Sequence, residues 1–108
     1  MADAGAILAR KHLANTPAII VGVTGSNGAY ALTDNPDRAG WTIQNLGTNT
    51  LFVELGSGAS TAVFHYALKA GSVNDDGSGG SVSQNTGSIY TGPITVAGTA
   101  ARYVVTEL

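Results

Sequence analysis

The chain contains no cysteine, so disulfide scaffolds, thiolate metal sites and cysteine nucleophiles are all excluded. Charged residues are also scarce: they make up 11% of the 108 residues, against a usual share of about 25%. The five lysines and arginines are scattered and the net charge is -2, so the sequence has no basic footprint for nucleic acid. No apolar run reaches membrane-spanning length, which predicts no membrane partner.

Small polar residues take the place of the missing charges. Glycine alone accounts for 15 positions, while the apolar fraction of 44% is ordinary. The length predicts one domain with one core. A polar, nearly uncharged surface does little long-range steering and suits broad contact with another protein. Nothing reads as a secretory signal, so assembly in a cytoplasm is expected.

Residues 1–16 differ in pattern from the rest and are interpreted as an N-terminal arm. Ala6, Ala9 and Leu13 recur at helical spacing, and glycine and proline are absent from residues 6–15. A helix this short is marginal in water, so the segment is either a docking arm or a disordered lead-in. The residues of the arm expected to contact a partner are Ile7, Leu8, Arg10, Lys11, His12 and Leu13.

Residues 17–108 predict a single all-β domain. Short, often β-branched segments alternate with turn signals such as Asn27-Gly28 and Asn35-Pro36. The candidate strands, not all of which are expected to form, are 17–24, 29–33, 41–46, 51–55, 61–68, 81–84, 88–90, 94–97 and 101–108. A helix over 61–70 competes with the strand there. About seven or eight short strands at this spacing are the pattern of an antiparallel sandwich, a jelly roll or a closed barrel, and a β-sandwich of jelly-roll type is the preferred prediction.

The stretch Arg38–Gly71 is expected to supply the core sheet. It holds the only tryptophan and both phenylalanines, so most of the large core side chains are expected there. The two-residue period places Trp41 and Ile43 on the core side of their strand. By contrast, Ala70–Gly80 is rich in glycine and is expected to be a mobile surface loop.

His65 raises the question of catalysis. Glu54 lies on the preceding expected strand, and Ser57 and Ser60 lie in the turn between the two strands. A Ser-His-Glu set would need the base oriented by the carboxylate and within reach of the nucleophile. The sequence has neither a nucleophile elbow nor an oxyanion-hole signature. A cross-strand His-Glu contact or an interface histidine is the preferred interpretation, so no enzyme activity and no catalytic residue are predicted.

Metal and cofactor sites are not predicted either. Asn74, Asp75 and Asp76 before Gly77 suggest a weak calcium loop, but the glutamate that an EF-hand needs is missing, and a solvated turn is preferred. His12 and His65 make no zinc spacing.

Aromatic side chains at strand spacing are more often core than a sugar-binding platform. The set concerned is Trp41, Phe52, Phe64, Tyr66 and Tyr103. Arg38 and Arg102 are expected to pair with Glu54, Glu107 or the terminal carboxylate, and such pairs set register when they lie across a subunit contact.

Three stretches carry a resemblance to a known family. They are NPDRAGWTIQNLGTNTLFVELGSGASTAVFHYALKAG, YTGPITVAG and RYVVTEL, within residues 35–108. This part of the chain resembles small virion structural proteins of tailed bacteriophages, the β-rich head-decoration or cement proteins. The resemblance implies a sandwich or jelly roll that forms oligomers, often trimers, on the outside of a capsid shell.

The expected function is therefore structural. The chain is expected to decorate or cement the capsid without enzymatic activity, with the major capsid protein and further copies of itself as partners. Its location would be the outer surface of the virion, after assembly in the bacterial cytoplasm. The alternative is a tail- or fibre-associated module that binds host carbohydrate through exposed aromatics such as Tyr30, Tyr66 or Tyr90.

Overall fold

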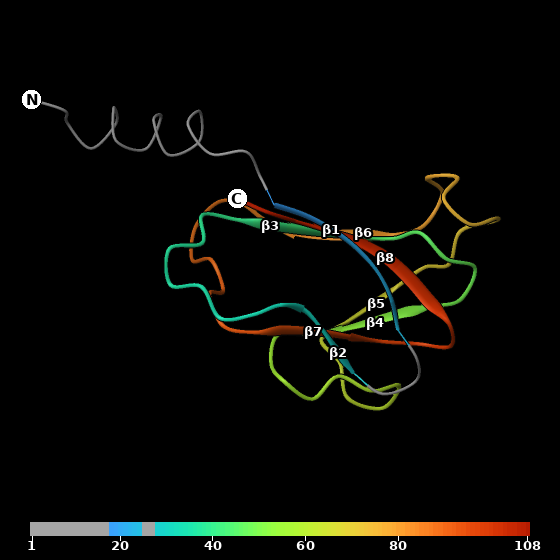
Figure 1. Ribbon diagram of the computed structural model, residues 1–108, viewed down its shortest axis with the longest axis horizontal. Coiled ribbons are helices and arrows are strands. Elements are labelled where there is room, and N and C mark those ends of the chain that lie inside the picture. Colours follow the sequence, from blue (N-terminus) through green and yellow to red (C-terminus); the bar gives the residue numbers. More distant parts are fainter. Residues whose placement is uncertain (1–17, 25–27) are drawn as a thin grey trace, which may run out of the picture.

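The computed structural model describes residues 18–24 and 28–108, and within them it shows eight strands and no helix. The strands are β1 (Ala18–Thr24), β2 (Ala29–Leu32), β3 (Trp41–Asn45), β4 (Leu51–Glu54), β5 (Tyr66–Leu68), β6 (Ser81–Gln84), β7 (Ile94–Ala97) and β8 (Ala101–Glu107). They form two sheets that lie face to face as two layers (Figure 1). The predicted arm, residues 1–16 with Ile7, Leu8, Arg10, Lys11, His12 and Leu13, lies outside the described residues, as does Asn27 of the expected hairpin turn.

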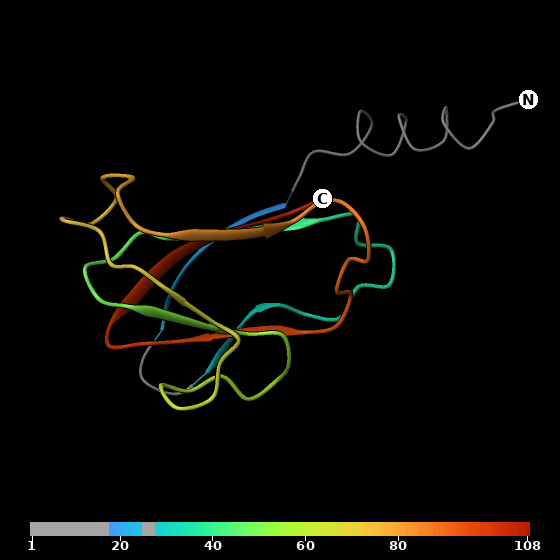
Figure 2. The same ribbon diagram turned by 180° about the vertical axis from the view of Figure 1, so that it is seen from behind.

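The strand order is that of a jelly roll. One sheet runs β1-β8-β3-β6 and the other β2-β7-β4-β5, and every paired neighbour is antiparallel. Apart from β4 and β5, consecutive strands lie in different sheets, so the chain crosses between the layers at almost every connection (Figure 2). The predicted antiparallel sandwich of jelly-roll type is confirmed.

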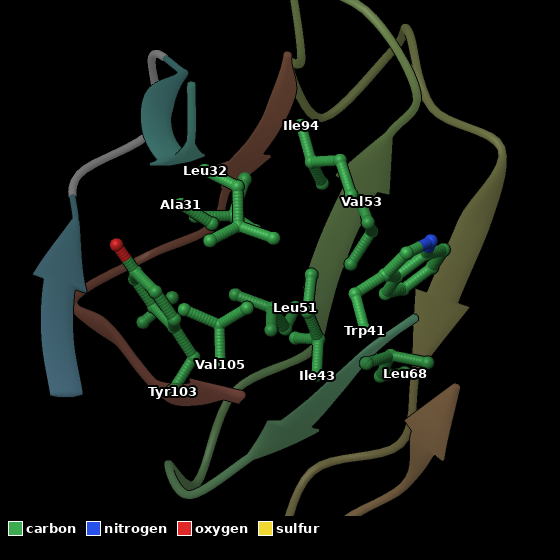
Figure 3. Close-up of a cluster of buried hydrophobic side chains, with 12 residues drawn as sticks. Ala31, Leu32, Trp41, Ile43, Leu51, Val53, Leu68, Ile94, Tyr103 and Val105 are labelled. Carbon is green, nitrogen blue, oxygen red and sulfur yellow. The ribbon is translucent and has the colours of Figure 1, made fainter. Parts of the chain in front are cut away.

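The core fills the space between the layers with side chains from both sheets (Figure 3). On β3 the predicted alternation is confirmed, because Trp41, Ile43 and Asn45 are buried while Thr42 is exposed. Other fully buried side chains of the cluster are Leu51, Val53, Ile94, Val96 and Val105. Three of these come from β7 and β8, so the core is shared between the Arg38–Gly71 stretch and the last strands.

The expectation that the large side chains of Arg38–Gly71 belong to the core is wrong for the two phenylalanines. Phe52 is only half buried and Phe64 is 42% exposed. The cause lies in the phase of β4, where Leu51 and Val53 face the core and Phe52 must face away from it.

The strand predicted over 61–68 is too long. Only Tyr66–Leu68 pairs with β4, and no helix replaces the missing part. Ser60 and Val63 exchange backbone hydrogen bonds of 3.0 and 3.3 Å, which closes a tight turn. The Ser60 hydroxyl also accepts from the N–H groups of Ala62 and Val63. These local bonds satisfy the backbone in a turn, in competition with a strand ladder.

The strand predicted over 88–90 does not form. Gly87, directly before this segment, has a positive φ of 72°, and the bend that it belongs to extends to Ser88. The backbone groups of Tyr90 then bind side chains: its N–H donates to Gln84 Oε1, and its carbonyl accepts from Arg38 Nη1. Side-chain partners thus take the place of a ladder in this segment.

The segment Ala70–Gly80, expected to be mobile, is tied to the body of the protein by hydrogen bonds. Gly71 N donates to Gly47 O and Asp75 N to Leu46 O, both at 2.8 Å, and Gly80 N donates to Lys69 O at 2.9 Å. Its glycines permit the turn, with Gly77 at a φ of 79°, but the backbone is anchored at both ends.

Candidate protein-contact surface

In the part of the chain that the structure describes, the outer face of the β2-β7-β4-β5 sheet carries most of the large apolar side chains that are exposed. Thr95 of β7 is the register partner of both Tyr30 on β2 and Glu54 on β4, so these three side chains share one face. Phe52, two residues before Glu54, shares it too. This face points away from the core, because the intervening residue Val53 is buried between the layers.

Four residues form what we call the outer-face apolar group: Tyr30, Phe52, Val63 and Phe64. The rings of Phe52 and Phe64 pack with their centroids 4.8 Å apart and their planes tilted by 49°. Even so, Tyr30, Val63 and Phe64 remain 58%, 48% and 42% exposed. Exposed aromatic residues of this kind are enriched at the centres of protein interfaces.

Residues 55–65, between β4 and β5, cover part of this face. The loop lies on the side of the sheet away from the other layer (Figures 1 and 2). Thr95 anchors it, because its hydroxyl accepts from Ala59 N at 3.0 Å and donates to Gly56 O at 2.9 Å. Gly28 permits the close approach, since a Cβ there would lie 2.6 Å from Ala59 O. Val63 and Phe64 are therefore presented by a loop held at several points.

His65, Glu54 and Ser60 also hold this loop in place. His65 N donates to Val53 O at 2.7 Å, and His65 Nδ1 accepts from Leu55 N at 3.0 Å. Glu54 Oε1 accepts from Gly58 N at 2.7 Å. The predicted cross-strand contact between His65 and Glu54 does not form as a hydrogen bond among the described residues, and Ser57 is an exposed turn residue. Each side chain has its own backbone partner instead.

The acidic turn at Asp75 and Asp76 likewise makes intramolecular contacts. Asp76 Oδ1 accepts from Ser78 N at 2.9 Å and Ser78 Oγ at 2.6 Å, and Oδ2 accepts from Val73 N at 3.2 Å. The hydrogen bond from the Ser78 hydroxyl, followed by that from the Ser78 backbone, lowers the pKa of Asp76. Within residues 18–24 and 28–108, no group of three or more histidine, aspartate or glutamate side chains is placed to hold a metal ion.

The two arginines form ion pairs of different kinds. Arg38 is fully buried and its Nε lies 2.8 Å from Glu107 Oε2, as one of the predicted pairings proposed. Arg102 instead pairs with Asp75, at 2.7 Å in an exposed setting, and this hydrogen bond raises the pKa of Arg102. Glu54 pairs with neither arginine.

The residues considered for a sugar platform do not lie on one surface. Trp41 and Tyr103 are buried in the core, and Trp41 Nε1 donates to Gln84 Oε1 at 3.0 Å. Tyr66 is half buried and packs against the core cluster. Only Phe52 and Phe64 of that set lie on the outer face, and Tyr30 joins them there.

Sequence reasoning missed the presentation of Val63 and Phe64 on a turn. The small, hydroxyl-rich run before them, GSGAST, was a local signal for a turn rather than a strand. No such signal marked the anchor Thr95, because its partners lie 36 and 39 residues away in sequence.

Comparisons with known proteins give little further information. No protein-family model matches the chain, and no curated protein matches it. Among solved structures, it is similar to a chain of the structure described as "Bacillus endospore appendages form a novel family of disulfide-linked pili". The TM-score is 0.47 and the identity 19%, over 85% of this chain and 82% of that chain. A likeness at this level carries no argument about function. In the part of the chain that the structure describes, no helix has the length and apolar character to cross a membrane.

Proposed function

We propose that the chain is a non-enzymatic structural protein of a bacteriophage virion, which decorates or cements the outer surface of the capsid. Its partners are the major capsid protein and further copies of itself, assembled in the bacterial cytoplasm. The observation that carries the contact role is the outer-face apolar group, whose residues Tyr30, Val63 and Phe64 are 42–58% exposed together on one face. The phage setting rests on the sequence resemblance over residues 35–108.

The manner in which Val63 and Phe64 are held supports contact as the role of this face. Bonds from Thr95, His65 and Ser60 fix the 55–65 loop. A surface ordered before binding loses less conformational entropy when a partner docks. Repeated copies on a capsid lattice also gain from avidity, so each contact needs only modest strength.

A co-sedimentation experiment tests the proposal. In the first part, virions of the phage that encodes the chain are analysed by mass spectrometry for its presence. In the second part, purified chain is added to capsid shells that lack it, and the shells are sedimented. The wild-type chain is expected to sediment with the shells in a fixed ratio to the capsid protein. Phe64→Ser is expected to weaken binding by about tenfold or more, since truncating a central aromatic contact typically costs at least about 1.4 kcal/mol.

Val73→Ser is the matched control. Val73 is 60% exposed, but it lies on the 71–80 loop, which is bonded to Leu46 and Gly47 at the end of β3 in the other sheet. This variant is expected to bind shells as the wild type does. Absence of the chain from virions, together with failure to sediment with shells, would rule the proposal out.

The second candidate is a carbohydrate-binding module of a tail or fibre, favoured by the 58% exposure of Tyr30. An aromatic ring open to solvent is the usual stacking surface for a sugar. Binding on a glycan array that Tyr30→Ala abolishes would support this candidate over capsid decoration. An array without hits would remove it.

A further inference from the structure

The outer edge of β1 is the long open edge of this sandwich. Four strands lie at sheet edges: β1 and β6 in one sheet, β2 and β5 in the other. β1 has seven residues, whereas β6 and β2 have four each and β5 has three. Within the described residues β1 pairs with β8 alone, in continuous register from Ala18 to Thr24. One side of its backbone therefore has no partner strand among the residues that the structure describes.

The hydrogen bonds of β8 show which of its residues face β1. Along an antiparallel strand, the N–H and C=O of one residue point to the same side, and the next residue points to the other. Leu46 N donates to Arg102 O at 2.8 Å, so the backbone groups of Arg102 face β3. Those of Tyr103 therefore face β1, where Gly22 is the register partner.

The same alternation identifies the open groups on β1. Gly22 directs its backbone groups to Tyr103, so the backbone groups of Val21 and Val23 point away from β8. The backbone groups of Ile19, two residues before Val21, also point away from β8. The open edge thus presents three N–H and C=O pairs spaced by two residues.

This edge lacks the features that protect open strands from pairing. Natural edge strands carry charges, proline or a bulge, or are very short. Ala18–Thr24 reads AIIVGVT, without charge or proline, and its pairing with β8 has no bulge. The other edges differ: β2 has a register shift between Tyr30 and Leu32, and β6 is the short polar segment SVSQ.

We propose that β1 pairs with β1 of a second copy of this chain, antiparallel about a twofold axis at Val21. In this register Val21 lies opposite Val21 of the second copy, and Ile19 lies opposite its Val23. All the open N–H and C=O groups of both edges then pair with each other, because 19 and 23 are equally far from 21. The strand carries no charge, so no like charges meet across the axis. The β1-β8-β3-β6 sheet continues across both copies.

This inference deepens the self-association within the proposed function, but it does not depend on a capsid. An isologous contact uses the same patch on both copies and closes on itself, which gives a dimer or an even-numbered assembly. The trimer that the phage resemblance implies requires a different contact. The mass of the assembly therefore decides between the two, whatever the outcome of the sedimentation experiment.

Cysteine cross-linking of the full chain is the sharpest test, because the wild type has no cysteine. Residues directly opposite in a hydrogen-bonded antiparallel pair have their Cα atoms about 5.5 Å apart, which a disulfide can span. Val21→Cys is expected to form a disulfide-linked dimer rapidly under mild oxidation. Ser83→Cys, an exposed position in the middle of the β6 edge, is the matched control and is expected to remain mostly monomeric under denaturing electrophoresis.

Proline provides the second pair of variants. Val21→Pro removes an N–H that faces the open edge, and Ser83→Pro removes one that faces outward from β6, since Val82 and Gln84 pair toward β3. Light scattering on the wild type and Ser83→Pro is expected to give the dimer mass, with half that mass for Val21→Pro. Val21→Lys, which places like charges at the axis, replaces Val21→Pro if the latter does not fold.

Hydrogen exchange adds a readout at single residues. The amides of Ile19, Val21 and Val23 are expected to be protected in the wild type and to exchange rapidly in Val21→Lys, while the amide of Gly22 stays protected in both. A monomeric or trimeric wild type, equal cross-linking of the two cysteine variants, or fast exchange at Ile19 and Val23 in the wild type would each overturn the twofold pairing.

Discussion

Arg38 is expected to be the most costly charged residue to remove. Its side chain is fully buried, and three of its four hydrogen bonds reach residues 52 to 69 positions away in sequence. Nε donates to Glu107 Oε2 at 2.8 Å, and Nη2 donates to Thr33 O at 2.7 Å. Nη1 donates to the carbonyls of Tyr90 and Gly92, at 3.0 and 2.8 Å. Arg38→Ala removes the shared partner of four acceptors.

The expected loss of stability follows from what those acceptors become. Breaking a buried ion pair by removing one partner typically costs about 3–5 kcal/mol, because the other charge stays desolvated. The Glu107 side chain is 20% exposed and regains some water, which lowers this part of the cost. The three carbonyls left without a donor add about 1 kcal/mol each, which offsets this reduction. A total near 3–5 kcal/mol is a large part of the 5–15 kcal/mol that holds a domain folded.

Urea denaturation measures this loss as a lower midpoint with an unchanged slope. The midpoint of thermal unfolding is expected to fall by about 12–20 °C, at roughly 4 °C per kcal/mol for a domain of this size. Arg102→Ala is the control: its ion pair with Asp75 is as short, at 2.7 Å, but exposed, and no change in midpoint is expected. If Arg38→Ala lost less than about 1 kcal/mol, or no more than Arg102→Ala, burial would not be what makes the Arg38 pair matter.

Three further predictions concern the core. Gly22→Ala is expected to cost about 1–3 kcal/mol in urea denaturation, because its Cβ would lie 2.5 Å from Tyr103 Cζ; an equal cost in a Tyr103→Ala background would contradict this. Burial raises the pKa of the Tyr103 phenol above the ordinary value of about 10, so the folded state holds this proton more tightly than the unfolded chain. The stability this provides is complete below about pH 10 and falls as the pH rises toward the folded pKa. In Tyr103→Phe, the urea midpoint is therefore expected to change less with pH across that range than it does in the wild type. Asn45→Ala is expected to cost about 2–3 kcal/mol, because Asn45 Nδ2 donates to three carbonyls, including Leu68 O at 3.1 Å; a midpoint within error of the wild type would show that those carbonyls find other donors.

Much of the fold was predictable because its signals are local. The two-residue alternation placed Trp41 and Ile43 on the core side of their strand, which the structure confirms. Seven predicted segments correspond to strands within about one residue at each end. The predicted 61–68 strand failed because Ser60 closes a local turn, and the 88–90 strand failed because side chains bind the backbone of Tyr90.

The contact surface was less predictable. The phase of β4 alone decides that Phe52 faces outward, and the sequence does not say which of its two faces meets the core. The loop that carries Phe64 depends on Thr95, which is far away in sequence. Pairing of Arg38 with Glu107 was one of several possibilities until the fold brought β8 beside it.

The sequence by itself determined the class of the protein: all-β, free of disulfides, sparsely charged, with short strands separated by tight turns. Those properties follow from composition and from spacing along the chain, which need no knowledge of distant contacts. Only the tertiary structure decided the strand order and the outward position of Phe52 and Phe64. It alone showed that β1 is the longest edge strand, with β8 as its one partner among the described residues, because an edge is defined by the strands that are not beside it.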